Sequence, residues 1–247
     1  MSALSKMTTV EAKLFGREPI AMFWGLVFPA ALLLVLGLFF PGADTPSADL
    51  GGFRLVDLYA PIVLALALAT LAFATLPAIL ATYRERGVLR RLQTTPVNPW
   101  RLVTAQLIVQ VSVALIAGGL AIAIAAMVFD IPLPESPLTF LGVYLLAAAS
   151  MLAIGLLIGA VAPTVSSGQG IGMAVYFPML FFAGVYFPRQ AFPEGLKTIS
   201  DLTPAGAAVQ ALSDTWAGTA PSASNLVVMA AYAIGAGVLA ALVFRWE

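Results

Sequence analysis

The chain has 247 residues, of which 61% are hydrophobic and 10% are charged, whereas a soluble domain normally has about 25% charged residues. Its twelve Lys and Arg residues balance its twelve Asp and Glu residues, so net charge gives no attraction to nucleic acid. The absence of His and Cys excludes zinc sites built from these residues, thiol nucleophiles and disulfides. We therefore expect an all-α integral membrane protein without catalytic residues, a metal site or a nucleic-acid partner.

Residues 4–18 predict an interfacial amphipathic helix ahead of the first membrane span. Leu4, Met7, Val10 and Leu14 fall on one face at 100° per residue, and basic residues fall on another. Such a helix lies on the membrane surface and contacts lipid headgroups. A plain charged flank would also explain the basic residues. Glu11 and Glu18 fall on the apolar face, which the amphipathic pattern does not explain.

Six uncharged runs follow, each long enough to cross the roughly 30 Å hydrocarbon layer at about 1.5 Å per residue. They predict six transmembrane helices at about 20–40, 58–81, 102–129, 138–161, 170–187 and 226–244, in a single membrane domain covering 1–247. The first run is too long for a signal-peptide core, so we expect it to be retained. No residue from 136 to 188 is charged, and a polar break at 163–169 divides this stretch into two spans.

Basic residues are segregated between the two sides of the membrane. With six spans, nine of the twelve fall on the side of both termini: Lys6, Lys13, Arg17, Arg84, Arg86, Arg90, Arg91, Arg101 and Arg245. The other side has the remaining three, together with eight acidic residues. The positive-inside rule therefore predicts a multi-pass protein with both termini in the cytoplasm.

The expected spans have no charged residue in their interior. Intramembrane charges normally mark proton or ion paths, so a proton- or sodium-coupled carrier is disfavoured. An intramembrane enzyme would lack groups for acid–base chemistry. The sequence also has no G-x-x-x-x-G-K-[ST] phosphate loop, so ATP that drives this protein would be hydrolysed by another chain.

Two glycine pairs have the G-x-x-x-G spacing that lets helices approach closely. They are Gly155/Gly159 in the fourth span and Gly168/Gly172 at the start of the fifth. We interpret both as helix-packing sites.

The connection between the second and third spans, 83–101, has five basic residues and one acidic residue. Val88, Leu89 and Leu92 recur at helical spacing, and Pro96 ends any helix there. A loop that only sets the topology would explain the arginines, but not the apolar set.

This segment, which reads E-R-G-x-L-R-R-L-x-x-T-P-V, resembles the cytoplasmic coupling segment of ABC type-2 export permeases, particularly their daunorubicin-resistance-like branch. Residues 181–194 are similar to the family's S-G-x-x-x-P-x-x-x-L-P stretch, and residues 202–204 to the L-x-P that follows it. The chain departs from the family pattern at Ala183, which replaces a Ser, at Arg90, where many members have an acid, and at Gln106, where Lys is common. These departures bear on the subfamily and the substrate.

The resemblance implies one half of an exporter, paired with a second permease half that is an identical chain or a sister. A separate ABC ATPase would bind ATP and Mg²⁺, and this chain would need no cofactor. The implied ATPase-coupling residues lie within the segment 84–96: Arg84, Glu85, Arg86, Gly87, Leu89, Arg90, Arg91 and Pro96. Residues 189–223 would form short helices that re-enter the membrane from outside, although the residues alone equally allow a loose loop. The analogy places the protein in a prokaryotic plasma membrane.

The fifth span offers an aromatic lining for a substrate path: Phe177, Phe181, Phe182 and Tyr186. An uncharged aromatic lining favours hydrophobic or amphipathic compounds such as drugs or lipids, although lipid-facing or interfacial aromatics would give the same pattern. The expected function is ATP-driven multidrug or lipid efflux. The alternatives are a polysaccharide or glycolipid export permease of the same superfamily, and a non-transport membrane assembly protein.

Overall fold

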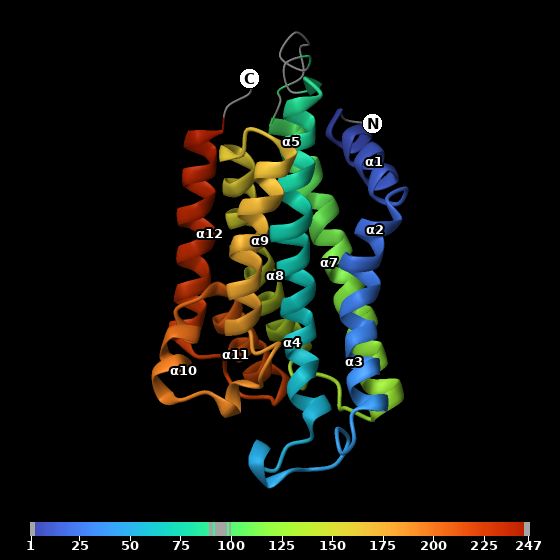
Figure 1. The fold of residues 1–247 in the computed structure, drawn as a ribbon, viewed down its shortest axis with the longest axis vertical. Coiled ribbons are helices and arrows are strands. Elements are labelled where there is room, and N and C mark those ends of the chain that lie inside the picture. The colour runs from blue at the N-terminus through green and yellow to red at the C-terminus, as the bar shows by residue number, and fades with distance from the viewer. Residues whose placement is uncertain (1–2, 89–90, 92–97, 99, 245–247) are drawn as a thin grey trace.

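The computed structural model describes residues 3–88, 91, 98 and 100–244, and all regular elements in this part of the chain are helical. Five of the described helices are long and apolar enough to cross a membrane: Pro19–Phe39, Leu55–Glu85, Trp100–Phe129 (α7), Pro137–Val161 (α8) and Ala223–Val243 (α12). They run side by side in one bundle, and α1 (Ala3–Phe15) lies at one end of it (Figure 1). The expected all-α membrane fold is thereby confirmed.

The fifth expected span, 170–187, corresponds to α9 (Val165–Phe182), which packs against α8 but is not among these five helices. This helix begins at Val165 rather than at 170 because Thr164 and Ser167 cap its first turn through reciprocal hydrogen bonds. It ends at Phe182, shortly before Gly184 turns the chain with a φ of +84°. Tyr186 therefore lies beyond the helix, and the count of six spans stays a prediction.

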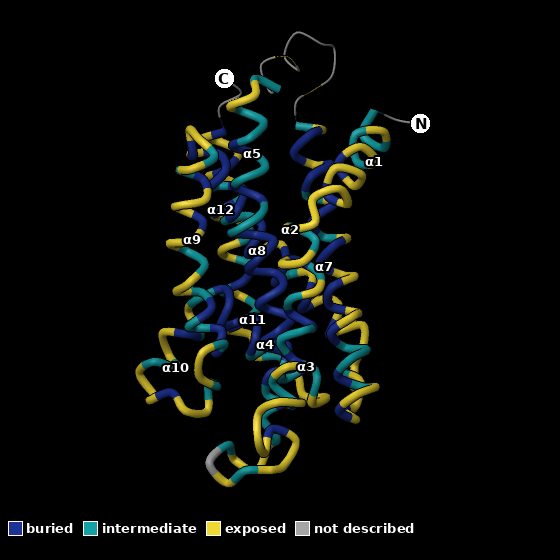
Figure 2. Tube along the Cα trace, turned by 45° about the vertical axis from the view of Figure 1, so that its right-hand side comes forward, coloured by how far each residue is buried: buried dark blue, intermediate teal, exposed yellow. Residues whose placement is uncertain are grey.

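Leu55–Glu85 is the central helix of the bundle. It consists of α4 (Leu55–Ala69), η3 (Thr70–Thr75) and α5 (Leu76–Glu85). It is buried over 78% of its most apolar stretch, compared with 17% for α12, and Figure 2 shows this contrast between the inner and outer helices. The helix starts at Leu55 rather than at 58 because Asp57, in its first turn, accepts hydrogen bonds from the backbone N–H of Arg54 at 3.3 Å and from the Arg54 guanidinium group at 2.7 Å.

Two spanning helices widen into π turns. In the first span, η1 (Phe23–Val27) separates α2 (Pro19–Met22) from α3 (Phe28–Phe39). In the central helix, η3 likewise separates α4 from α5. A proline, Pro29 or Pro77, follows each π turn, and its missing N–H removes an α-helical hydrogen bond. The two π turns contact each other, so both irregularities lie at one level of the bundle.

Glycines let α8 and α9 pack closely on η3. A Cβ added at Gly155 of α8 would lie 2.0 Å from the backbone oxygen of Ala72. A Cβ added at Gly172 of α9 would lie 2.1 Å from the backbone oxygen of Phe73. The other glycine of each G-x-x-x-G pair also meets the central helix, so both pairs pack within this chain.

Residues 189–223 contain three short helices: η4 (Arg189–Ala191), α10 (Glu194–Asp201) and α11 (Pro204–Trp216). They lie at the end of the bundle opposite α1 (Figure 1). α11 packs among α4, α8 and α12, with Ala205 and Leu212 fully buried. The side chain of Arg189 donates a 2.7 Å hydrogen bond to Asp201 and so fixes η4 to the end of α10. This region is therefore helical, and its re-entry into a membrane stays a prediction.

Candidate functional site

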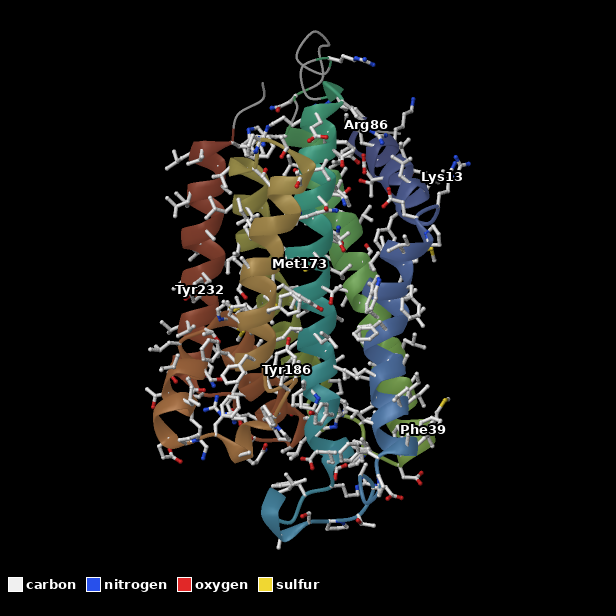
Figure 3. The ribbon with its side chains drawn as sticks, in the orientation of Figure 1. Lys13, Phe39, Arg86, Met173, Tyr186 and Tyr232 are labelled. Carbon is white, nitrogen blue, oxygen red and sulfur yellow. The ribbon has the colours of Figure 1, made fainter. Side chains whose placement is uncertain are left out.

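A groove of about 1020 Å³ lies between the first span with α1 on one side and α5 with α9 on the other. Its walls are mainly apolar and include the side chains of Trp24, Met173 and Tyr186. In Figure 3, Arg86, Met173 and Tyr186 follow one another from the α1 end of the bundle toward the opposite end. Ligand pockets for drug-sized molecules have volumes of about 300–1,000 Å³. The groove is therefore large enough for one such molecule.

Two of the four predicted path residues line this groove. Phe177 faces it from α9, with 55% of its surface exposed, and Tyr186 faces it from the loop after α9. Phe181 instead stacks on Phe192, with 5.4 Å between ring centroids, and Phe182 packs edge-on against Phe181. These two rings lie where the chain turns toward α10, so they pack on that connection and do not line the groove.

The groove is also lined by residues of the first span and the central helix that the sequence analysis did not assign. Trp24 and Phe28 of the first span line the groove with their ring centroids 4.6 Å apart. The hydroxyl groups of Thr70 and Tyr176 are hydrogen-bonded at 2.9 Å and join η3 to α9. The aromatic content of the first span was visible in the sequence, but hydropathy does not show which face of a helix borders a groove.

Charged and polar side chains line the groove at its α1 end. Glu11 is only 6% exposed and accepts a hydrogen bond from the hydroxyl group of Tyr83. Burial raises the pKa of Glu11, and the hydrogen bond from Tyr83 opposes this shift in part. Arg17, Glu18 and Arg86 line the same end and are exposed. The groove thus joins a polar end to a long apolar wall.

The buried face of α1 differs from the predicted apolar face. Val10 and Leu14 are 54% and 45% exposed, whereas Glu11 and Phe15 are buried. The helix packs against α7, and Tyr83 of the central helix supplies the hydrogen bond that lets Glu11 be buried. Of the two acidic exceptions in the amphipathic pattern, Glu11 is therefore explained by a tertiary contact, whereas Glu18 is exposed.

Arg84, an implied ATPase contact, points its guanidinium group at the C-terminal end of α8. The group donates hydrogen bonds of 3.1 Å to the backbone oxygens of Gly159 and Ala160, and a further bond to that of Ala162. It also lies 5.8 Å from the ring of Phe244, in a cation–π arrangement. The last carbonyl groups of a helix have no partner within it, so Arg84 caps α8. Its contact with an ATPase stays a prediction.

Glu85 holds the beginning of α9. Its Oε1 atom accepts a 2.8 Å hydrogen bond from the backbone N–H of Val165, where the helix dipole favours a negative charge. Together with Arg84, this contact joins the end of α5 to the end of α8 and to the start of α9. A displacement of these two residues therefore acts on three helices at once.

The other implied coupling residues are described in part. Arg86 and Arg91 are exposed at this end of the bundle, and Gly87 turns the chain after α5 with a φ of +64°. Three of the coupling residues lie outside the described residues: Leu89, Arg90 and Pro96.

Comparison with protein families identifies most of this chain. Residues 3–215 match the family described as ABC-2 type transporter, and this match extends from α1 almost to the end of α11. It includes the residues that line the groove and residues 84–96. A search of curated proteins gives no match. Because the family match covers most of the chain, this protein belongs to the ABC-2 type transporter family and is a membrane permease of that family.

Proposed function

We propose that this permease is the membrane subunit of an ATP-driven exporter of hydrophobic or amphipathic compounds, such as drugs or lipids. A separate ABC ATPase would bind ATP and Mg²⁺ and supply the energy, as membership of the family supports in general terms. The observation that carries the proposal is an apolar, aromatic groove whose polar end lies beside Arg84, Glu85 and Arg86.

Coupling follows from the contacts of Arg84 and Glu85. An ATPase that moves residues 84–96 would displace the joined ends of α5, α8 and α9 together, because charge-assisted hydrogen bonds connect them. Both α5 and α9 border the groove, so their rigid-body movement changes its width. In this way closure of an ATPase is converted into a change at the substrate path.

The lining favours amphipathic substrates over polysaccharides. Trp24, Phe28 and Phe177 present apolar surfaces along the groove, whereas a sugar polymer would need many hydrogen-bonding partners. Assignment to the daunorubicin-resistance-like branch is part of this proposal, and export of a polysaccharide or glycolipid is its alternative.

We further propose six spans, with α9 as the fifth, in a prokaryotic plasma membrane, and a second permease half of the same or a sister chain. The start of α1 and the ends of α5 and α12 lie at one end of the bundle (Figure 1). Most of the basic residues in the described part of the chain gather at this end: Lys6, Lys13, Arg17, Arg84, Arg86, Arg91 and Arg101. The positive-inside rule supports a cytoplasmic location for this end.

Cysteine labelling tests this orientation without background, because the chain has no Cys of its own. Asn98 and Ser136 are exposed and precede α7 and α8, which start at opposite ends of the bundle (Figure 1). A membrane-impermeant maleimide added to intact cells should label Ser136→Cys and leave Asn98→Cys unlabelled. The reverse pattern would overturn the proposed topology.

Co-purification tests the function itself. The chain should be expressed with the ABC ATPase encoded beside it and isolated in mild detergent as a complex that hydrolyses ATP. Arg86→Ala should weaken the complex, whereas Arg101→Ala, an exposed control at the start of α7, should not. Glu85→Gln should leave the complex intact but reduce substrate-stimulated hydrolysis, because it weakens the contact with α9. If no ATPase copurifies with the unchanged chain in several detergents, the proposal fails.

A further inference from the structure

The polar end of the groove contains a buried carboxylate without a cationic partner. Glu11 is 6% exposed, and one of its oxygens accepts the hydrogen bond from Tyr83. Within the described residues Glu11 makes no ion pair, and its second oxygen accepts no hydrogen bond. Arg17 and Arg86 line the same groove, but neither forms an ion pair with Glu11 in the described part of the chain. Burial of an ionised carboxylate costs free energy unless a positive charge lies beside it, so a bound cation would stabilise this site.

A second unpartnered acceptor lines the same groove. Gln106 of α7 is 2% exposed, and its Oε1 atom has no hydrogen-bond partner in the described part of the chain. α1 packs against α7, so Glu11 and Gln106 come from neighbouring helices. Buried carbonyl oxygens are normally satisfied, so this oxygen is available to a hydrogen-bond donor on a ligand.

On the basis of the proposed export function, we propose that this end of the groove binds the ammonium group of a cationic amphiphile. The ammonium group would donate hydrogen bonds to the side-chain oxygens of Glu11 and Gln106. An ammonium group has three N–H donors, no acceptor and a positive charge, which matches both unpartnered acceptors. The apolar part of the same molecule would lie along Trp24, Phe28 and Phe177.

An anionic headgroup fits this end less well. Glu11 would repel it, and it could not satisfy the unpartnered oxygen of Gln106, which needs a donor. Arg17 and Arg86 could attract an anion, but both are exposed and remain hydrated. Tyr83 acts as a positioning residue, because its hydroxyl group holds one carboxylate oxygen of Glu11 and leaves the other for the ligand.

A pair of matched probes tests the inference. The full chain, in nanodiscs of phosphatidylcholine, is titrated with monodansylcadaverine, which joins a primary ammonium group to an apolar fluorophore. The control probe is its N-acetyl derivative, which has the same apolar body and no charge. Because charge-assisted hydrogen bonds are the stronger ones, we expect the ammonium probe to bind about tenfold tighter or more. Equal affinities for the two probes would overturn the inference.

Variants locate the preference. Glu11→Gln should reduce the ratio of the two affinities to about one, and Gln106→Met should reduce it in part. Glu135→Gln changes an exposed carboxylate that does not line the groove and should leave the ratio unchanged. Binding of the N-acetyl probe shows that the groove of each variant is intact. A ratio that survives both Glu11→Gln and Gln106→Met would contradict the inference. If Glu11→Gln does not fold, Gln106→Met and Tyr83→Phe take its place. An unchanged ratio of the two affinities in both variants would then contradict the inference.

The source of the ammonium group is tested in the same titration. Phosphatidylethanolamine has a primary ammonium headgroup, and competition when it is added to the nanodiscs would identify a membrane lipid as the ligand. Absence of competition would assign the site to free amphiphiles. The titration needs no ATPase. It can therefore fail while the ATPase complex forms, or succeed while no ATPase copurifies, so the two proposals are tested separately.

Discussion

The central helix Leu55–Glu85 and the outer helix Ala223–Val243 have the same mean hydropathy of 2.4 over their most apolar stretches, yet 78% of one stretch and 17% of the other are buried. The outer helix packs mainly on α8, whereas the central one contacts α3, α7, α8, α9 and α11. The central helix also has a π turn and side chains that reach other helices, among them Thr70, Tyr83 and Arg84. Hydropathy therefore explains why a segment enters the membrane, and packing together with polar contacts explains its place in the bundle.

Substitution of Gly155 should have the largest effect on this contrast. In Gly155→Ala the new Cβ would lie 2.0 Å from a backbone oxygen of the central helix, which cannot move aside like a side chain. We expect a loss of about 3 kcal/mol, the upper range for overpacking, seen as a lower midpoint of thermal unfolding in detergent. Gly235→Ala in the outer helix meets nothing within 4 Å and should be neutral or slightly stabilising. Equal losses of stability in Gly155→Ala and Gly235→Ala would show that close packing does not distinguish the central helix from the outer one.

Removal of the Arg84 side chain should have the next largest effect. Arg84→Ala leaves the backbone oxygens of Gly159, Ala160 and Ala162 without their charged donor, for an expected loss of about 2 kcal/mol. Arg84→Lys should recover only part of this stability, because an ammonium group lacks the planar fork of a guanidinium group. The same thermal unfolding experiment checks both variants. Arg101→Ala, an exposed change, is the control and should cost less than about 0.5 kcal/mol.

Loss of one hydroxyl group should have a smaller effect. Tyr176→Phe removes the 2.9 Å hydrogen bond to Thr70 and should destabilise the protein by about 1 kcal/mol. Tyr232→Phe is the matched change on the outer helix, where the side chain is 37% exposed and points away from the bundle (Figure 3). A double-mutant cycle with Thr70→Val measures the pairwise energy. An interaction energy near zero would show that this hydroxyl pair does not fix α9 to the central helix.

Titration of Glu11 should give the smallest effect, and its sign is fixed. Burial raises the pKa of Glu11, so the folded chain holds this proton more tightly than the unfolded chain. The resulting stabilisation is fully present below the unfolded pKa of about 4.3 and is lost as pH rises through the folded pKa. The unfolding midpoint of the unchanged protein should therefore fall relative to that of Glu11→Gln as pH is raised. A difference that rises with pH would contradict the assignment.

Most helix positions could be read from the sequence because charged residues and prolines mark their ends. α8 (Pro137–Val161) lies within one residue of the predicted 138–161, since Glu135 and Pro163 bracket it. The start of α9 could not be placed in this way. Ser167 is polar and suggested a break, but it caps the helix together with Thr164. Hydropathy treats such a capping residue as part of a loop.

The site was harder to predict because its contacts are distant in sequence. The exceptional position of Glu11 was visible, but its partner Tyr83 is 72 residues away and carries no signal of its own. Arg84 belongs to the segment that resembles a coupling motif, yet its described contacts are backbone oxygens of α8. A single sequence shows that a charge is unusual in its place, and only the fold shows what satisfies it.

Because of the π turn Thr70–Thr75, the direction in which Arg84 and Glu85 point depends on the number of residues in the central helix. A π turn accommodates one residue more than an α-helical turn, and each residue of an α-helix advances the chain by about 100°. A one-residue deletion here that restored regular α-helix would rotate Arg84 and Glu85 by about this angle, away from α8 and α9. Loss of one codon in the middle of the segment that encodes the central helix would thus redirect the residues at the end of this helix. During evolution this helix should accept many substitutions more readily than a change of a single residue in its length.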